Sequence, residues 1–280
     1  MIFLGYLRGC AQCTSATDEF TIIRGLALQQ NNRQVVWITG ASSGIGAALA
    51  KTYSHKGAKL LLTARNSQNL ELTRASLSAP ELAEIYPADV TIREDMSHLM
   101  DKFDSLGSFP DTIILNAGTY KPMSVADFSS GSIREIMDLN FHSVALAIEL
   151  LLPRLKSRGT GHIAVVSSLA ADKGFPFAGA YSASKCALVR LCESLQVELL
   201  DLGIYLSVVQ PGFVSTPLTA KNKFPMPFMI GADDAASLIF KKLQKKHLSI
   251  RFPWQMSWIM RVISCLPESL ALKVNRWMAK

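Results

Sequence analysis

Residues 35–50 read VVWITGASSGIGAALA, and this stretch decides the fold. The apolar, β-branched run at its start is typical of a strand that is buried on both faces. A glycine-rich turn follows, and an Ala/Leu-rich pattern then predicts a helix. The stretch therefore predicts strand, turn and helix in direct succession, which is the opening unit of a doubly wound α/β fold.

The three glycines of this turn have different expected roles. Gly40 allows the sharp exit from the strand, Gly44 removes side-chain bulk where a diphosphate would approach the backbone, and Gly46 lets the helix pack close to the sheet. Free N–H groups at the positive end of the helix attract phosphate. The spacing G-x-x-x-G-x-G differs from the general dinucleotide pattern, and taken alone it is also compatible with a purely structural turn.

Further motifs follow the turn in a fixed order, namely Asn116-Ala117-Gly118, Ser168, Tyr181-Ser182-Ala183-Ser184-Lys185 and Pro211-Gly212. With these motifs the chain resembles the short-chain dehydrogenase/reductase family over about residues 34–246. The resemblance implies a single-domain, Rossmann-like, doubly wound α/β fold with a mostly parallel seven-stranded sheet and helices on both faces. Family members mostly read Asn-Asn-Ala-Gly where this chain has Leu115 before Asn116, a departure that leaves the sheet-stabilising asparagine in place.

The resemblance assigns catalytic roles to Asn140, Ser168, Tyr181 and Lys185. Lys185 lies four residues after Tyr181, so both side chains face the same side of a helix. A tyrosine has an ordinary pKa of about 10, and a nearby ammonium lowers that pKa by favouring the phenolate. Ser168 can donate to a carbonyl oxygen as charge builds there. Asn140 would complete a proton route through a water, or be an ordinary, satisfied helix asparagine.

The end of the predicted strand 59–64 indicates the cofactor. An acidic side chain at this position would bind a free ribose 2′-hydroxyl, whereas this chain has Arg65, whose guanidinium suits a 2′-phosphate. We therefore predict NADP(H) in preference to NAD(H); the alternative is a solvated arginine. Asp89, which the resemblance places at the adenine, is alternatively the cap of a helix predicted at 92–106. Together with the residues that the resemblance implies, the full set of predicted cofactor-binding residues is Gly40, Ser42, Ser43, Gly44, Ile45, Gly46, Arg65, Asp89, Val90, Asn116, Ala117, Gly118, Tyr181, Lys185, Pro211, Gly212, Val214 and Thr216.

Composition excludes several other classes of protein. A chain of 280 residues with 49% hydrophobic content can bury one sizeable core. The net charge of +7 is spread over scattered basic residues, and no nucleic-acid motif is present, so we predict no nucleic-acid partner. Five cysteines fit a reducing, cytoplasmic location, and the lone pair Cys10 and Cys13 does not predict a metal site. A serine hydrolase is excluded because no G-x-S-x-G surrounds Ser168.

The pattern divides the chain into a flexible N-terminal extension (1–33), a catalytic domain (34–251) and an apolar C-terminal helical segment (252–280). Arg261 and Pro267 leave the C-terminal apolar run short of the roughly 20 residues that span a bilayer. Three tryptophans beside basic residues favour a helix pair at a membrane interface, anchored by Trp254, Trp258 and Trp277. The alternative is a segment that folds over the pocket or is buried between subunits.

The sequence predicts an NADP(H)-dependent carbonyl reductase or alcohol dehydrogenase, cytoplasmic and peripheral on a membrane. Loop 218–230 resembles a substrate-covering lid, and its aromatic and Met side chains indicate a lipophilic carbonyl or alcohol such as a keto-lipid or a steroid-like ketone. Core packing is the alternative for this loop. The resemblance also implies a homodimer or homotetramer formed through two long helices. The competing interpretation is a non-catalytic NADP(H) sensor or membrane scaffold.

Overall fold

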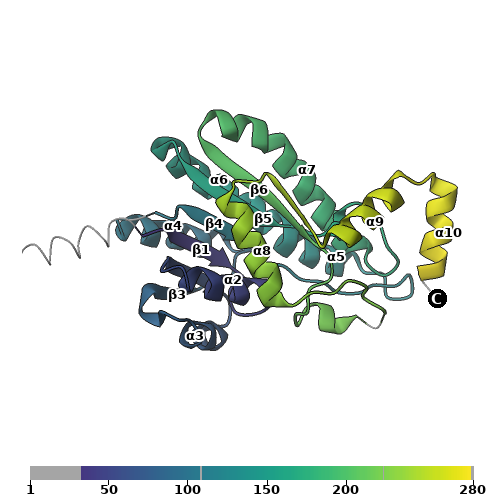
Figure 1. Ribbon diagram of the computed structural model, residues 1–280, viewed down its shortest axis with the longest axis horizontal. Helices are drawn as coiled ribbons and strands as arrows, with labels where there is room; N and C mark the ends of the chain where they lie inside the picture. The colour runs from purple at the N-terminus through teal and green to yellow at the C-terminus, as the bar shows by residue number, and fades with distance from the viewer. Residues whose placement is uncertain (1–32, 108, 223, 279–280) are drawn as a thin grey trace, which may run out of the picture. The chain divides into compact units, whose positions relative to one another are not determined.

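The computed structural model describes residues 33–107, 109–222 and 224–278 (Figure 1). One parallel sheet has the strand order β3-β2-β1-β4-β5-β6-β7. Its strands are β1 (Val35–Thr39), β2 (Lys59–Ala64), β3 (Ala83–Pro87), β4 (Thr112–Leu115), β5 (Gly161–Val166), β6 (Ile204–Pro211) and β7 (Ser249–Phe252). The predicted doubly wound, seven-stranded sheet is confirmed.

Helices cover both faces of the sheet, because successive strand residues point to opposite sides. Trp37 packs in one core with α4, α6 and α7, whereas Ile38 packs in the other core with α2, α3 and α8. The α-helices are α2 (Gly44–Ser54), α3 (Ser67–Ala75), α4 (Arg93–Ser105), α5 (Ser130–Met137), α6 (Ser143–Arg158), α7 (Gly179–Asp201), α8 (Ala232–Gln244), α9 (Trp254–Cys265) and α10 (Glu268–Met278). Short 3₁₀ turns are η1 (Pro80–Leu82), η3 (Leu169–Ala171) and η4 (Thr219–Lys221), and η2 (Asp138–His142) is a π turn.

Local capping explains where predicted and observed helices differ. We predict a helix at 69–78, but α3 starts at Ser67 because the Asn66 side chain accepts a hydrogen bond from the Asn69 amide at 2.8 Å. The sequence also predicts one amphipathic helix at about 132–156, where the structure has α5, η2 and α6 in direct succession. Helix α6 ends at Gly159, whose left-handed backbone (φ +67°) suits a residue without a side chain.

The strand order places the functional end of the sheet at the junction of β1 and β4. The chain winds outward from β1 to β3 and then returns to β4, so the connections leave these two neighbouring strands in opposite directions. In open α/β sheets, ligands bind outside the carboxyl ends of the strands at such a switch point. Asn116 joins these strand ends, since its side-chain amide donates to the carbonyls of Thr39 and Gly40 at 3.1 and 3.2 Å.

Among the described residues, one helical run, 130–158, is long and apolar enough by composition to cross a membrane. Its apolar side chains, including Val144, Leu151 and Leu155, are buried against the sheet in the core formed with α4 and α7. The run is therefore a core helix of this fold, and its composition reflects burial within the protein.

The C-terminal part of the chain continues from the edge strand β7. This strand pairs with β6 and runs to Phe252, one residue past the boundary that we predict at 251. The helices α9 and α10 follow it, as the apolar pattern of this segment predicts (Figure 1). The predicted extension at the N-terminus and the pair Cys10 and Cys13 lie outside the described residues, as do the side chain of Trp277 and any contact it makes.

Candidate active site

A cleft of about 380 Å³ lies at the carboxyl ends of the strands, and the predicted site residues converge on it. Asn140 and Gly46 are buried and do not line the cleft. The predicted residues that line the cleft are Gly40, Ser42, Ser43, Gly44, Ile45, Arg65, Asp89, Val90, Asn116, Ala117, Gly118, Ser168, Tyr181, Lys185, Pro211, Gly212, Val214 and Thr216.

The glycine turn is built by close approach of backbone to backbone. A Cβ atom at Gly46 would lie 2.2 Å from the Gly40 carbonyl oxygen, so only glycine lets α2 start this near to β1. Ser43 is the N-cap residue of α2 and makes no side-chain capping bond. The first amides of α2 therefore remain available to an anion that binds in the cleft.

The adenosine end of the cleft carries one charge of each sign. Arg65 is 72% exposed at the end of β2, and its guanidinium lies 3.8 Å from the Asp89 carboxylate. That carboxylate accepts from the Thr91 amide at 3.0 Å, whereas the N-cap of α4 is Ile92. The alternative interpretation of Asp89 as the cap of this helix is therefore wrong. Asn66 also lines the cleft here, which the sequence did not single out because its cap role only appears once α3 is placed.

Ser168, Tyr181 and Lys185 meet at the opposite end of the cleft. Ser168 is the N-cap of η3 directly after β5, and the other two residues lie one turn apart on α7. The Lys185 ammonium donates to the Val166 carbonyl at 2.9 Å and lies 5.9 Å from the centre of the Tyr181 ring. The Ser168 hydroxyl accepts from the Ala170 amide at 3.1 Å, and it lines the same cleft as Tyr181 and Lys185. The structure therefore brings together the three groups that the sequence predicts.

Burial governs the protonation of this group. Burial raises the pKa of the Tyr181 phenol, the Ser168 hydroxyl acts in the opposite direction, and Tyr120, whose ring packs edge-on at 5.2 Å, adds to the increase. The prediction that Lys185 lowers the pKa of the phenol is wrong for this arrangement. Burial instead lowers the pKa of Lys185 itself to about 8. The pair thus holds a protonated phenol, which is an acid, beside an amine whose pKa is about 8.

Asn140 lies in the π turn η2, and its side chain is fully buried and hydrogen-bonded to residues outside the turn. Its amide oxygen accepts from the Thr119 amide at 2.7 Å, and its nitrogen donates to the Thr119 carbonyl and to Ser184, both at 3.0 Å. All the polar atoms of this side chain are therefore partnered. Asn140 therefore links Thr119, which follows β4, to Ser184 of α7, and its amide oxygen lies next to Gly118. Thr119, which lines the cleft, escaped the sequence analysis because its partner lies 21 residues away.

The C-terminal segment packs against the Pro211-Gly212 turn, which lines the cleft. The Gly212 amide donates to the Phe252 carbonyl at 2.7 Å, and a Cβ atom at Gly212 would lie 3.2 to 3.3 Å from side-chain atoms of Pro253 and Met256. The first turn of α9 therefore packs directly on the Pro211-Gly212 turn. Residues from the following loop, including Pro217, Leu218 and Thr219, also line the cleft.

Comparison with known proteins agrees with this geometry. The family model for short chain dehydrogenases matches residues 34–225, which is more than half of the chain. The chain belongs to the short-chain dehydrogenase family. It is an oxidoreductase of this family with a Rossmann-like fold.

Relatives of this short-chain dehydrogenase cover most of its length. An "uncharacterized oxidoreductase" of Myxococcus xanthus is 33% identical over 83% of this chain and 92% of the relative. An "11-beta-hydroxysteroid dehydrogenase-like 3" protein of Arabidopsis thaliana is 32% identical over 90% of this chain and 84% of the relative. A solved short-chain dehydrogenase/reductase from Burkholderia phymatum, in complex with NAD, has a TM-score of 0.75 at 24% identity and covers 86% of this chain and 95% of its own.

The lowered pKa of Lys185 predicts how the stability of this short-chain dehydrogenase depends on pH. Between about pH 8 and the ordinary lysine value near 10.4, the unfolded chain holds the Lys185 proton and the folded chain does not. The free energy of unfolding should therefore rise with pH in this range by about 1.4 kcal/mol per pH unit relative to Lys185→Met. Urea unfolding from pH 7.5 to 10 measures the difference. The exposed Lys56→Met is the control, and equal slopes for all three proteins would contradict the prediction.

Proposed function

We propose that this protein is an NADP(H)-dependent reductase or dehydrogenase that interconverts a lipophilic ketone and its alcohol. The observation that carries the proposal is that Ser168, Tyr181 and Lys185 line the same cleft as the glycine turn. A proton donor, a hydroxyl for the carbonyl oxygen and an amine thus share one cavity with a phosphate site.

The residues present fit a dinucleotide. The turn has the close backbone approach that a diphosphate needs, because a side chain at Gly40 would lie 2.9 Å from the Ala117 Cα atom. Arg65 and Asp89 would hold the adenosine end, and Lys185 would bind the nicotinamide ribose. Similar folds in solved proteins described with NAD, NADP and NADPH support this assignment.

A bound nicotinamide would supply or accept the hydride at the carbonyl carbon. For reduction, Tyr181 would give its proton to the oxygen, which becomes the alcohol hydroxyl. Ser168 would donate a hydrogen bond to the same oxygen while negative charge builds there. The raised pKa of Tyr181 keeps the phenol protonated for this step, and protonated Lys185 would stabilise the phenolate that the transfer leaves behind.

Exposed apolar side chains on the loop after β6 support a lipophilic substrate. Phe224, Phe228 and Met229 are exposed on the loop after β6, and Phe224 packs edge-on against Phe213. The relatives named "11-beta-hydroxysteroid dehydrogenase-like" favour a polycyclic ketone among such substrates. The test is purified protein with NADPH and a panel of short, long-chain and polycyclic ketones. Turnover confined to the lipophilic members supports the proposal, and turnover of small polar ketones alone overturns it.

The alternative is a cofactor sensor or scaffold without catalysis. It is disfavoured because the proton donor, its neighbouring amine and the serine hydroxyl are all placed on the cleft. Cofactor binding without turnover of any ketone or alcohol would support the sensor.

Arg65 is expected to set the choice between NADPH and NADH. Arg65→Ser should raise the KM for NADPH about 10- to 100-fold, because a charge-assisted bond to the 2′-phosphate contributes about 1.5–3 kcal/mol. The KM for NADH should change less than about twofold, since NADH lacks this phosphate. Steady-state kinetics with both cofactors measure the split. Arg93→Ser, which removes an exposed arginine paired with Glu149, is the control. An unchanged KM for NADPH would show that Arg65 is only solvated.

We further propose that the protein forms a homodimer or homotetramer through α7 and the 130–158 helical run. We also propose that it is cytoplasmic and docks peripherally on anionic membranes through α9 and α10. Trp254 and Trp258 are 69% and 61% exposed one turn apart on α9, and Val262 continues the same face. Tryptophan beside basic side chains suits a lipid headgroup region. The face lies on the segment that packs against the Pro211-Gly212 turn of the cleft, which would bring the cleft near a lipid-dissolved ketone.

Replacing both tryptophans should release the protein from vesicles. Trp254→Gln combined with Trp258→Gln should lower binding to phosphatidylglycerol vesicles about tenfold or more, because each buried aromatic side chain contributes about 1.5–3 kcal/mol. Flotation measures the bound fraction. Leu72→Gln, which replaces an equally exposed apolar side chain on α3, is the control. Equal flotation of all three proteins would exclude docking through α9.

A further inference from the structure

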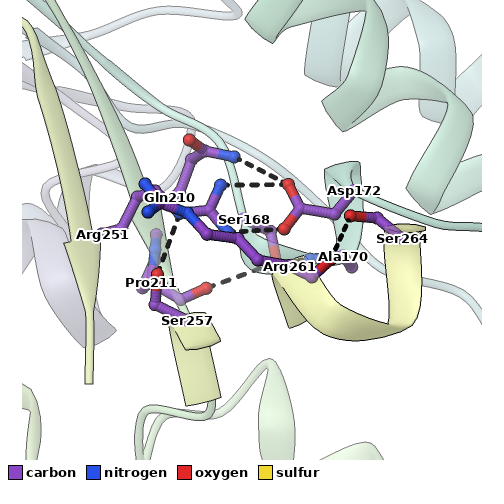
Figure 2. A network of polar contacts seen from close by, with 9 residues as sticks. All are labelled: Ser168, Ala170, Asp172, Gln210, Pro211, Arg251, Ser257, Arg261 and Ser264. Atoms are coloured by element: carbon purple, nitrogen blue, oxygen red, sulfur yellow. Dashed lines mark hydrogen bonds and ion pairs between the residues drawn. The ribbon is translucent and has the colours of Figure 1, made fainter. Parts of the chain in front are cut away.

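A mostly buried polar network joins the turn after Ser168 to the C-terminal part of the chain (Figure 2). Asp172 lies at the end of η3 and forms a two-pronged ion pair with Arg251 of β7, with one nitrogen–oxygen distance of 3.0 Å. Gln210 of β6 adds a weak third contact to the same carboxylate at 3.5 Å. The Arg251 Nε atom donates to Ser257 of α9 at 3.0 Å.

The sheet register explains why these side chains meet. Gln210 and Arg251 are paired residues on neighbouring parallel strands, so their side chains point to the same face of the sheet. Both reach the carboxylate of Asp172, which no strand carries. The edge strand β7 and α9 are thereby connected to the segment that contains Ser168.

The short length of η3 makes this connection relevant to Ser168. Ser168 begins the turn, and its hydroxyl accepts from the Ala170 amide at 3.1 Å. Asp172 ends it, with its amide donating to the Leu169 carbonyl at 3.2 Å. Only one tight helical turn separates the two residues, so a displacement of Asp172 moves the backbone that orients the Ser168 hydroxyl.

The ion pair is poorly explained as a source of stability. The Arg251 and Asp172 side chains are only 13% and 14% exposed, and removing two charges from water offsets much of their attraction. A directional, two-pronged arginine–carboxylate contact does fix geometry. We propose that Asp172 and Arg251, with Gln210 beside them, are positioning residues that hold the Ser168 hydroxyl toward the substrate carbonyl. This inference rests on the proposed function, in which Ser168 binds that oxygen.

A double-mutant cycle on ketone reduction tests the inference. The proteins are the wild type, Asp172→Asn, Ser168→Ala and the double variant, with kcat, KM and NADPH affinity measured well below their melting temperatures. Asp172→Asn should lower kcat about 10- to 100-fold, since a displacement near 1 Å costs about that much, and leave NADPH affinity within about twofold. In the Ser168→Ala background the same change should lower kcat less than about twofold, because the group it positions is gone.

Two further variants keep the result interpretable. Arg251→Lys retains the charge but loses the two-pronged contact, so it should lower kcat in the same direction even if Asp172→Asn folds poorly. Asp104→Asn breaks the ion pair to Arg154, away from the cleft, and should leave kcat unchanged. Equal losses with and without Ser168, or unchanged kcat in both Asp172→Asn and Arg251→Lys, would overturn the inference. Full activity of Ser168→Ala would instead overturn the role of Ser168 in the proposed function.

Discussion

Tyr181→Phe is expected to lower kcat for ketone reduction on the order of 10²- to 10⁴-fold, the contribution of a positioned general acid. The variant loses only the hydroxyl oxygen, while the ring keeps its edge-on packing against Tyr120. NADPH affinity and the melting temperature should therefore change little, because neither the glycine turn nor the core is altered. Kinetics under saturating NADPH, with cofactor fluorescence and thermal unfolding, separate these effects.

Tyr120→Phe is the matched control, since it removes a hydroxyl from the neighbouring ring and leaves the proposed proton donor intact. A Tyr181→Phe variant with wild-type kcat would mean that another group or solvent protonates the alkoxide. A larger loss of kcat in Tyr120→Phe than in Tyr181→Phe would show that Tyr120, and not Tyr181, is the proton donor.

Ser168→Ala is expected to lower kcat about 10²- to 10³-fold, as the removal of one hydrogen-bond donor to a developing oxyanion does. The loss should appear in kcat and in kcat/KM together, because this bond strengthens only as charge builds on the oxygen. Cofactor affinity should stay unchanged. The Ser168 hydroxyl also caps η3, so a thermal unfolding measurement accompanies the kinetics.

Ser168→Thr separates the two contributions of the serine. It retains a hydroxyl that can cap η3 and donate to the substrate, so it should recover part of the activity that Ser168→Ala loses. A loss in KM without a loss in kcat would show that Ser168 only binds the ground state.

The sequence was most informative where one physical requirement dominates a stretch. Buried parallel strands need unbroken apolar runs, so β1, β2 and β4 can be predicted from their composition. The glycine turn can be predicted because the close approach of Gly46 to the Gly40 carbonyl leaves no room for a side chain, so that position requires glycine. Motif spacing then carried nearly all predicted site residues to one cleft.

Features that depend on contacts between distant segments of the chain could not be predicted from the sequence. The side chain of Asn140, in the π turn, is hydrogen-bonded to Thr119 and Ser184, which no helical periodicity connects to it. The pair of Asp172 and Arg251 spans 79 residues and arises from the register of β6 and β7. The pKa of Tyr181 is raised where the sequence predicts that it is lowered, because the burial of the phenol cannot be read from the sequence.

The central claim is that a reduced nicotinamide and Tyr181 act together on one carbonyl group. Its most direct test is reduction of a lipophilic ketone with NADPH that carries deuterium at the transferable ring position, followed by mass spectrometry of the alcohol. The account predicts that the wild type forms an alcohol with one deuterium on the carbinol carbon. The rate at which this alcohol forms should fall on the order of 10²-fold or more in Tyr181→Phe. An alcohol without deuterium, or no alcohol although NADPH binds, would contradict it.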